Sequence, residues 1–412
     1  MIKYLVLLLP LYIYAQSLKS LLDYAASSNE LIMSKTLSSK AKQSKVKSSE
    51  NDLFPTVDLG GYYQRKDKPS PFRSGTTYSE YAKVSYDVYT GGKKTNTIKQ
   101  KENEFKSSMF DLAATKKSIE LAIVQDFYNI KSAESKLLAR EEASRAVKAQ
   151  LERMQKFFKA SLATSDDVDR LQSAYDSNVY IIESLKFKIL SLKKSLELKV
   201  GKKIDALDGS VFKKIDSDEA YEFDAIKSLK AKKQSIVNAS AIIESYYYPQ
   251  VRIEDSYNFY GYKDKPYILG HPINLIYKQN TVMATLNFRV FDFGVLSEAK
   301  KATVLEADAL NKQIIYQEKE QVYQQELAVH RIKTAKLKIK SAKSALKAGE
   351  SALKSITQKY NSGIVDNVVY LDALSAKTEA KSTYKEALNN LELAYALYYY
   401  YNAKKLGEYL SE

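Results

Sequence analysis

The sequence predicts a mainly α-helical protein that also carries four membrane-type β-strands and is built from two copies of one structural repeat. Three observations predict this fold. Two long segments without proline carry apolar residues at a three–four spacing, four short segments alternate between apolar and polar residues, and matched markers recur at equal distances in the two halves. The 412 residues are 45% hydrophobic and 27% charged, which is typical of neither a disordered chain nor a polytopic helical membrane protein.

Residues 1–15 have the features of a secretory signal peptide. Lys3 supplies a positive charge, residues 4–15 are apolar, and Ala15 is a small residue before a plausible cleavage position. The apolar run is too short to span a membrane as a helix. A buried N-terminal helix is the alternative, which Pro10 in the middle of the run disfavours. We therefore expect an exported chain.

The composition excludes several classes of site. Without cysteine the chain forms no disulfide, thiolate metal site, cysteine nucleophile or cysteine-borne lipid anchor. The only histidines, His271 in a Gly/Pro-rich loop and His330 in a charged helix, are expected at the solvated surface. No Ser/His/Asp set, HExxH motif or phosphate loop is present. We therefore predict no catalytic residues, no metal site and no cofactor.

The chain has a formal net charge of +15. Its lysines are spread singly along helical segments beside Glu, Ser and Gln, a pattern typical of a solvated helix face. Because export also argues against it, no nucleic-acid partner is expected.

Short markers define the repeat. Tyr89–Gly92 (YTGG) is matched by Phe291–Gly294 (FDFG), and Ser161–Asp167 (SLATSDD) is matched by Gly363–Val369 (GIVDNVV). The second copy begins 202 residues after the first in both cases, so the segment between the markers has the same length in both halves. This predicts a duplicated rigid element.

Two prolines mark the start of the strands, Pro55 in the first half and Pro249 in the second, and they lie only 194 residues apart. A variable loop therefore lies between each proline and the glycine marker. We assign the first structural repeat to residues 16–210 and the second to residues 211–412.

The proline-free segments predict long coiled-coil helices. In the second repeat the seam positions are spaced alternately by four and three residues, and the same spacing is found 202 residues earlier in the first repeat. The second-repeat positions are Ala342, Leu346, Gly349, Leu353, Ile356 and Tyr360. Each long helix would be roughly 100 Å in length. The expected long helices are about 93–160 and 295–361, the shorter ones after the turns are about 165–202 and 366–406, and helices near 17–49 and 218–245 precede the strands.

The alternating segments predict four strands. Each is close in length to a tilted transmembrane strand and has one apolar and one polar face with tyrosine near its ends. Alternation alone also fits a soluble hairpin with one wet face, but the signal peptide and the long helices favour the membrane. The expected strands are about 53–64, 78–89, 251–262 and 281–290, with hairpin tips at 65–77 and 263–279 that are rich in Pro, Gly and charge.

Four strands cannot close a membrane barrel, and open sheet edges are not tolerated in lipid. Several copies of the chain must therefore share one barrel. This argument predicts an oligomer and does not fix the number of copies.

These features together resemble the TolC-like outer-membrane efflux protein family. The matching residues are the proline before the first strand of each half, the YTGG and FDFG segments, and the turn motifs SLATSDD and SGIVDNVVYLDA. The resemblance covers essentially the whole mature chain. It implies a homotrimer with a shared 12-stranded barrel, four transmembrane strands per chain, in the outer membrane, and a helical barrel in the periplasm.

The resemblance also implies the function. Such proteins are exit ducts of tripartite efflux pumps or type I secretion systems that passively conduct substrate. They dock an inner-membrane pump through a periplasmic adaptor and catalyse no reaction. A non-conducting coiled-coil structural protein of the cell envelope is the alternative, but it leaves the amphipathic strands unexplained. Drugs, metal ions and polypeptides remain open as substrates.

Family gate residues transfer only in part. Tyr360 and Asp372 match the tyrosine and the second aspartate that line the closed tip in the family, but Val365 and Val369 replace the expected arginine and first aspartate. Asp366 is a candidate substitute. Independently of the family, three copies of Asp372 around a symmetry axis would attract cations. The alternatives are that Asp372 solvates or caps a helix start and that Tyr360 is a core residue.

The two helix-hairpin turns are the expected adaptor-docking tips. They comprise Ser161, Leu162, Ala163, Thr164, Ser362, Gly363, Ile364 and Val365.

Overall fold

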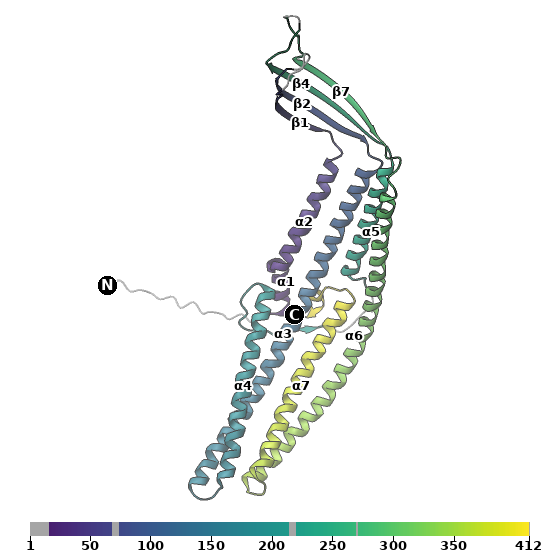
Figure 1. The fold of residues 1–412 in the computed structure, drawn as a ribbon. Coiled ribbons are helices and arrows are strands. Elements are labelled where there is room, and N and C mark those ends of the chain that lie inside the picture. The colour runs from purple at the N-terminus through teal and green to yellow at the C-terminus, as the bar shows by residue number, and fades with distance from the viewer. Residues whose placement is uncertain (1–15, 68–73, 214–219, 269–270, 412) are drawn as a thin grey trace, which may run out of the picture. The chain divides into compact units, whose positions relative to one another are not determined.

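The computed structural model describes residues 16–67, 74–213, 220–268 and 271–411, so the predicted signal peptide lies outside the described residues. The chain divides into two compact units (Figure 1). We call the first, made of Met1–Thr36, Asp111–Ala225 and Gln317–Glu412, the hairpin unit, and the second, made of Leu37–Phe110 and Ile226–Tyr316, the strand unit.

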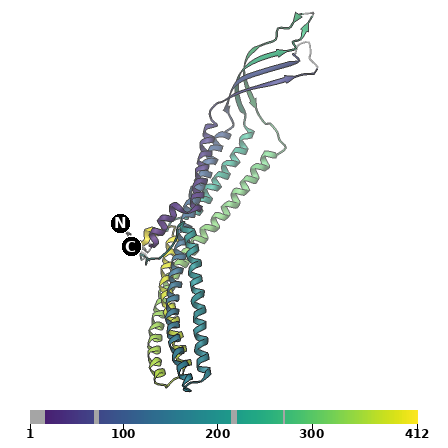
Figure 2. The same ribbon diagram turned by 90° about the vertical axis from the view of Figure 1, so that its left-hand side faces the viewer.

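Two helices of 67 residues each, α3 and α6, run through both units. In the strand unit α2, α3, α5 and α6 run side by side in both views (Figures 1 and 2). The helix bounds are α1 Leu18–Ser28, α2 Glu30–Asn51, α3 Lys93–Lys159, α4 Ser165–Val200, α5 Asp224–Glu244, α6 Val295–Asn361 and α7 Asn367–Tyr401. Among the described residues, no helix is both long and apolar enough to cross a membrane.

The segment expected as one helix near 17–49 is two helices that meet at Asn29. The Asn29 backbone is extended, and its side-chain oxygen accepts the N–H groups of Leu31 at 3.0 Å and Ile32 at 3.1 Å. Its amide also donates to the Lys199 carbonyl at 2.7 Å. Asn29 thus caps the start of α2 and also hydrogen-bonds the C-terminal end of α4, which explains the break between α1 and α2.

The repeat is preserved at the helix ends. Both ends of α6 are offset from those of α3 by the spacing that separates the sequence markers, and the start of α7 is offset from that of α4 by the same spacing. The backbone conformation just before the long helices is also repeated: Gly91 and Gly92 have positive φ, and so do their equivalents Phe293 and Gly294. The duplicated markers therefore encode the same strand-to-helix connection in both halves.

Gly91→Ala is expected to destabilise the strand unit by about 2 kcal/mol. Gly91 has φ +63°, and a Cβ there would lie 2.6 Å from the Ser245 carbonyl oxygen and 2.7 Å from the Tyr248 Cβ. Gly92→Ala is the control, since at φ +86° it has backbone strain but its nearest neighbour atom is 3.6 Å away. Thermal unfolding followed by circular dichroism measures both. Equal losses would show that the close contact carries no cost.

The four predicted strands form one antiparallel sheet in the order β1-β2-β4-β7. The two predicted hairpins are joined by pairing of β2 with β4, and β1 and β7 are the edges. The strand bounds are β1 Thr56–Arg65, β2 Thr76–Tyr89, β4 Gln250–Lys263 and β7 Lys278–Asn287. Two two-residue pairs were not predicted: β3 Val211–Phe212 with β8 Leu410–Ser411, and β5 Tyr267–Ile268 with β6 His271–Pro272.

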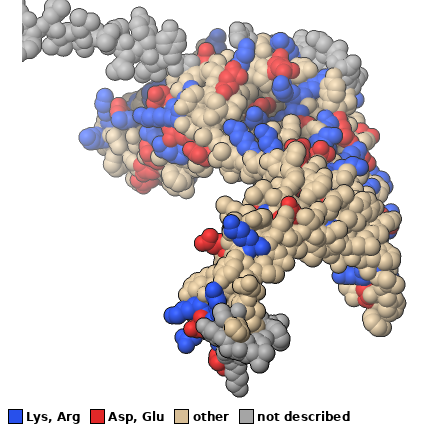
Figure 3. Space-filling model, turned by 90° about the horizontal axis from the view of Figure 1, so that it is seen from above, with Lys and Arg blue, Asp and Glu red and all other residues tan. Residues whose placement is uncertain are grey.

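Burial on the two central strands of the sheet, β2 and β4, is the reverse of that in a soluble protein. Along β2 the predicted apolar face is exposed, while the polar positions between are at least partly covered. On the covered face Arg252 pairs with Asp87 at 2.6 Å and Lys83 with Glu254 at 3.7 Å. Figure 3 shows few charged side chains over much of the sheet and many over the helices. An apolar face turned to the surroundings and a polar face turned inward is the pattern of a lipid-exposed strand.

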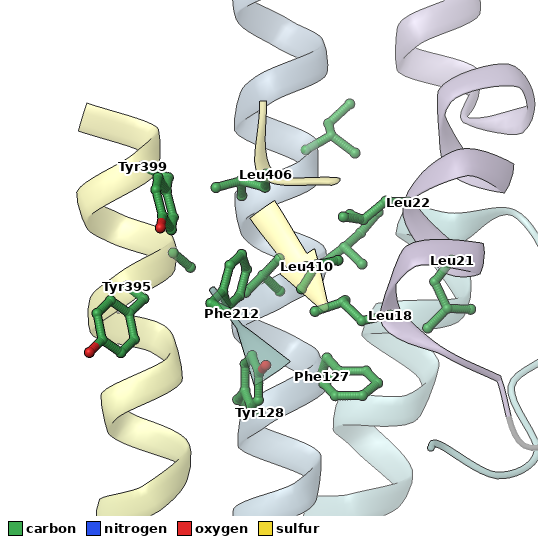
Figure 4. Packing of buried hydrophobic residues seen from close by; sticks show 14 of the residues in the cluster. Leu18, Leu21, Leu22, Phe127, Tyr128, Phe212, Tyr395, Tyr399, Leu406 and Leu410 are labelled. Carbon is green, nitrogen blue, oxygen red and sulfur yellow. The ribbon is translucent and has the colours of Figure 1, made fainter. Parts of the chain in front are cut away.

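The largest core lies in the hairpin unit, where chain segments far apart in sequence meet (Figure 4). Leu18 and Leu21 of α1 pack with Phe127 of α3, Phe212 of β3 and Leu410 of β8. The short β3–β8 pair therefore closes the core against the long helices. No periodicity marks two-residue strands, which is why the sequence did not reveal this core.

The predicted coiled-coil seam is confirmed by a second cluster in the hairpin unit. The cluster joins α3, α4, α6 and α7, and it contains predicted seam residues together with others. Its members include Val147, Leu151, Met154, Leu171, Tyr175, Leu353, Ile356, Tyr360, Tyr370 and Leu374.

Candidate functional site at the helical hairpin tips

Two equivalent turns join α3 to α4 and α6 to α7. Leu162 and Ile364 each donate the backbone N–H to the carbonyl five residues earlier, at 2.8 and 2.9 Å. The residues before them, Ser161 and Gly363, have φ of 59° and 72°. This is the Schellman arrangement that ends a helix with one left-handed residue. Glycine adopts it without strain, whereas Ser161 occupies a region that disfavours a side chain.

Each turn ends in a helix cap. The Thr164 hydroxyl accepts the Asp167 N–H, and the Asp167 carboxylate accepts the Thr164 N–H, both at 3.3 Å, which forms a capping box at α4. Asp366 caps α7 by accepting the Val369 N–H at 3.0 Å. The structure thus gives Asp366 a helix-capping contact, and its role at a gate stays a prediction.

The turns present exposed apolar side chains at equivalent positions. Leu162 is 75% exposed and Ile364 is 70% exposed. Ala163 and Val365 are half-buried, and the remaining predicted tip residues, Ser161, Thr164, Ser362 and Gly363, are exposed. Matched apolar side chains on two neighbouring turns suit the docking of another protein.

Two hydrogen-bonded links join the hairpins near their tips. Arg153 of α3 donates to the Asn361 side-chain oxygen at 3.0 Å. The Asn367 amide donates to the Asp167 carbonyl at 3.2 Å and to its carboxylate at 3.3 Å. Sequence reasoning missed both links, because the hairpins must first be placed side by side.

Tyr360 lies in the seam, as the core alternative expected. Its ring stacks on Tyr370 with centroids 5.0 Å apart and an interplanar angle of 17°. Burial raises the pKa of both phenols. Tyr360 therefore packs in the seam, and its role at a gate stays a prediction.

Asp372 is exposed on the first turns of α7, in a different place from Tyr360. It lines a cavity of about 230 Å³ together with Arg140, Ser177 and Asn178. Tyr360 and Asp366 line another cavity, of about 400 Å³, so the structure brings these two gate candidates together and places Asp372 apart from them.

Above the tips, ion pairs join α3 to α7 on two flanks. Lys377 donates to Glu142 at 2.6 Å, and Lys381 donates to its other oxygen. On the opposite flank the pairs are Lys136 with Glu386 at 2.7 Å and Arg140 with Glu379 at 3.3 Å. These contacts hold the first repeat to the second.

Glu142→Gln is expected to lower stability by about 1 kcal/mol at pH 7, since the site is partly solvated. The hydrogen bonds from Lys377 and Lys381 lower the pKa of Glu142 from 4.5 to about 2. A lowered folded-state pKa stabilises above the unfolded value, and the effect is lost as pH falls from 4.5 toward 2. Urea unfolding at pH 7 and pH 2.5 should show a difference that shrinks on acidification. A difference independent of pH would show that the charge is not responsible.

In the part of the chain that the structure describes, no group of three or more His, Cys, Asp or Glu side chains is placed to hold a metal ion.

Comparison with known protein families found a match over part of the chain. The family described as Outer membrane efflux protein matches residues 21–179. A search among characterised proteins by sequence found no match.

Solved structures match nearly the whole chain. The Campylobacter jejuni CmeC outer membrane channel has a TM-score of 0.83 at 15% identity, over 93% of this chain and 85% of that one. A membrane protein from Pseudomonas aeruginosa has a TM-score of 0.82 at 13% identity, over 93% of both chains. The outer membrane protein VceC from Vibrio cholerae has a TM-score of 0.81 at 12% identity, over 94% of this chain and 96% of that one.

The resemblance seen in the sequence is thus confirmed: residues 21–179 match the family described as Outer membrane efflux protein, and the chain has the fold of the outer membrane channels that it is similar to.

Proposed function

We propose that this protein is the outer-membrane exit duct of a tripartite efflux pump or type I secretion system and passively conducts substrate across the outer membrane. The observation that carries the proposal is the four-stranded sheet, whose apolar face is exposed and whose polar face is ion-paired. The polar face would line the water-filled lumen, and the apolar face would contact lipid.

The edges of the sheet support assembly. Among the residues that the structure describes, β1 and β7 are each paired on one side only. In lipid an unpaired edge is costly, so β7 of one copy would pair with β1 of the next. Three copies would give the 12-stranded barrel of a homotrimer, above a periplasmic helical barrel.

The hairpin tips would serve docking and gating. The turns 161–164 and 362–365, with exposed Leu162 and Ile364, would receive a periplasmic adaptor that links the channel to an inner-membrane pump. The links Arg153–Asn361 and Asn367–Asp167 would hold the two hairpins together in the closed channel. Asp372 would form an acidic ring of three carboxylates, and this exposed position supports that role.

Asp372→Asn is expected to weaken cation selectivity in single-channel recordings from planar bilayers. The control is Asp366→Asn, because asparagine also caps a helix and only the charge is lost. A change in the control instead would move the acidic constriction to Asp366.

The same recordings test the channel itself. Discrete, cation-selective openings from the purified trimer are expected, and openings unaffected by either variant would keep the channel but refute an acidic gate at these residues. A monomeric, salt-extractable protein without conductance would refute the channel and support the non-conducting structural protein.

A further inference from the structure

Three rows of side chains lie on the apolar face of the sheet, at the ends of the strands next to the hairpin tips. Residues in register on neighbouring strands lie side by side on one face. We call these rows the rim patch, and charged side chains gather at this end of the sheet (Figure 3). Counted toward the tips, the first row is Gly61, Glu80, Phe259 and Lys278, the second is Tyr63, Tyr78 and Gly261, and the third is Arg65, Thr76 and Lys263.

The rim patch contains a cavity of about 610 Å³. Gly261 lies inside β4, and a Cβ placed there would come no closer than 3.8 Å to Tyr78. A side chain would therefore fit at this position, and the glycine leaves a hollow open. A glycine inside a strand often marks a place where a ligand approaches closely. The wall of the cavity includes Gly61, Tyr63, Tyr78, Glu80, Phe259 and Gly261.

Aromatic rings and one carboxylate border the cavity. The Tyr63 and Tyr78 ring centroids lie 5.2 Å apart, and both side chains are exposed, as is Phe259. Glu80 is exposed too, and within the described part of the chain its carboxylate forms no ion pair. The face of an aromatic ring packs against the C–H groups of a sugar, and a carboxylate accepts hydrogen bonds from hydroxyl groups. The cavity therefore suits a sugar.

Basic side chains lie beside the cavity. Arg65 and Lys263 are exposed in the third row, and among the described residues neither side chain forms an ion pair. Lys278 lies over the Phe259 ring, 5.8 Å from its centroid. The rim patch thus holds three cations and one carboxylate, that of Glu80. Arginine and lysine next to an apolar, lipid-facing band are well placed to bind the phosphates of lipid headgroups.

We propose that the rim patch binds a phosphorylated glycolipid of the surrounding membrane. Arg65 and Lys263 would pair with its phosphate groups, and its sugar would occupy the hollow at Gly261 beside Tyr63 and Tyr78. The acyl chains would lie along the apolar face of the sheet. The inference rests on the part of the proposed function that places this face in lipid.

The cavity distinguishes a glycolipid from a simple anionic phospholipid. A phospholipid would pair with the basic side chains as well, but it carries no sugar ring. The hollow at Gly261 would then stay open, and the Glu80 carboxylate would lie beside lipid without a hydrogen-bond donor, which costs free energy. A sugar fills the hollow and supplies hydroxyl donors to Glu80.

The first test is lipid binding by the purified oligomer in detergent, measured by native mass spectrometry. The probes are lipid A, which is a phosphorylated, acylated disaccharide, and phosphatidic acid, which has a phosphate but no sugar. We expect lipid A to bind at least about tenfold more tightly, because its hydroxyl groups add hydrogen bonds to a charged group. Equal affinities for the two lipids would overturn the glycolipid site.

The basic side chains are tested by Arg65→Gln/Lys263→Gln. This double variant should bind lipid A at least about tenfold more weakly, since each basic side chain near an anionic headgroup adds about fivefold to the affinity. The matched control is Lys40→Gln/Lys312→Gln, which removes the same charge from exposed lysines of α2 and α6 in the same unit. Equal losses in both double variants would show that only net charge matters and would overturn the site.

The hollow is tested by Gly261→Val. Valine favours strands, so the sheet should still form, and the amount of heat-resistant oligomer checks this. We expect the affinity for lipid A to fall to that for phosphatidic acid, while phosphatidic acid binds as before. A variant that keeps the full preference for lipid A would overturn the placement of the sugar at Gly261.

Conductance in bilayers of phosphatidylcholine, which contain no glycolipid, tests the proposed function separately. Openings in these bilayers, together with lipid A binding that neither rim-patch variant changes, would overturn the inference and leave the channel intact. Lipid A binding with the expected losses in the variants, but without any openings, would support the inference and contradict a conducting channel.

Discussion

Ala284→Lys is expected to prevent insertion of the chain into the outer membrane, whereas Met283→Lys, one residue earlier, is expected to be tolerated. Ala284 of β7 is exposed on the apolar face of the sheet, where it is in register with Ile253 of β4. A lysine there would lie in the hydrocarbon of the membrane, at a cost of roughly 2–4 kcal/mol per copy near the midplane. In a homotrimer the cost is incurred three times.

Met283→Lys is the control, because successive residues of a strand face opposite sides of the sheet and Met283 therefore faces the polar side. It is in register with Glu254, which already pairs with Lys83 at 3.7 Å. A lysine at this position gains a carboxylate partner on a wet surface. The measurement is the amount of heat-resistant oligomer in washed outer membranes for each variant. Comparable loss in both variants would contradict the assignment of the faces, and insertion of both would contradict a lipid-facing sheet.

Periodicity is what made the helices and strands predictable. Every residue of a coiled-coil seam repeats the same environment, so positions such as Leu151 and Leu353 were placed correctly from spacing alone. The same holds for the alternating strands, whose bounds in the structure differ from those expected by a few residues. The helix-hairpin turns followed from the equal distances between markers.

What periodicity cannot supply is the relation between distant segments. The links Arg153–Asn361 and Asn367–Asp167 involve ordinary polar residues, and only the packing of two hairpins gives them a partner. The break at Asn29 arises from a hydrogen bond to Lys199, which no local pattern reveals. Tyr360 was proposed for a gate and for a core, and the stacked Tyr370 ring supports the core interpretation.

Phe127→Ala is expected to cost about 3–5 kcal/mol in stability, the largest loss of any single truncation considered. Phe127 of α3 is fully buried, and its ring meets Tyr128 edge-on at 5.3 Å. Leu18 packs in the same cluster (Figure 4). Removing the ring leaves a cavity at the point where α1, α4 and the β3–β8 pair close on the long helix, and a close-packed core relaxes only partly around it.

The internal repeat supplies the control for this prediction. The repeat-equivalent of Phe127 is Val329 of α6, which is 54% exposed. Val329→Ala should change stability by no more than about 0.5 kcal/mol, as expected for an exposed site. Denaturant midpoints of the detergent-solubilised protein measure both variants. Equal losses of stability in the two variants would show that the core at Phe127 does not hold the hairpin unit together. A much larger loss for Phe127→Ala would show that the duplicated helices have unequal roles. In that case α3 is buried under α1 and the β3–β8 pair, whereas α6 is exposed at the equivalent position.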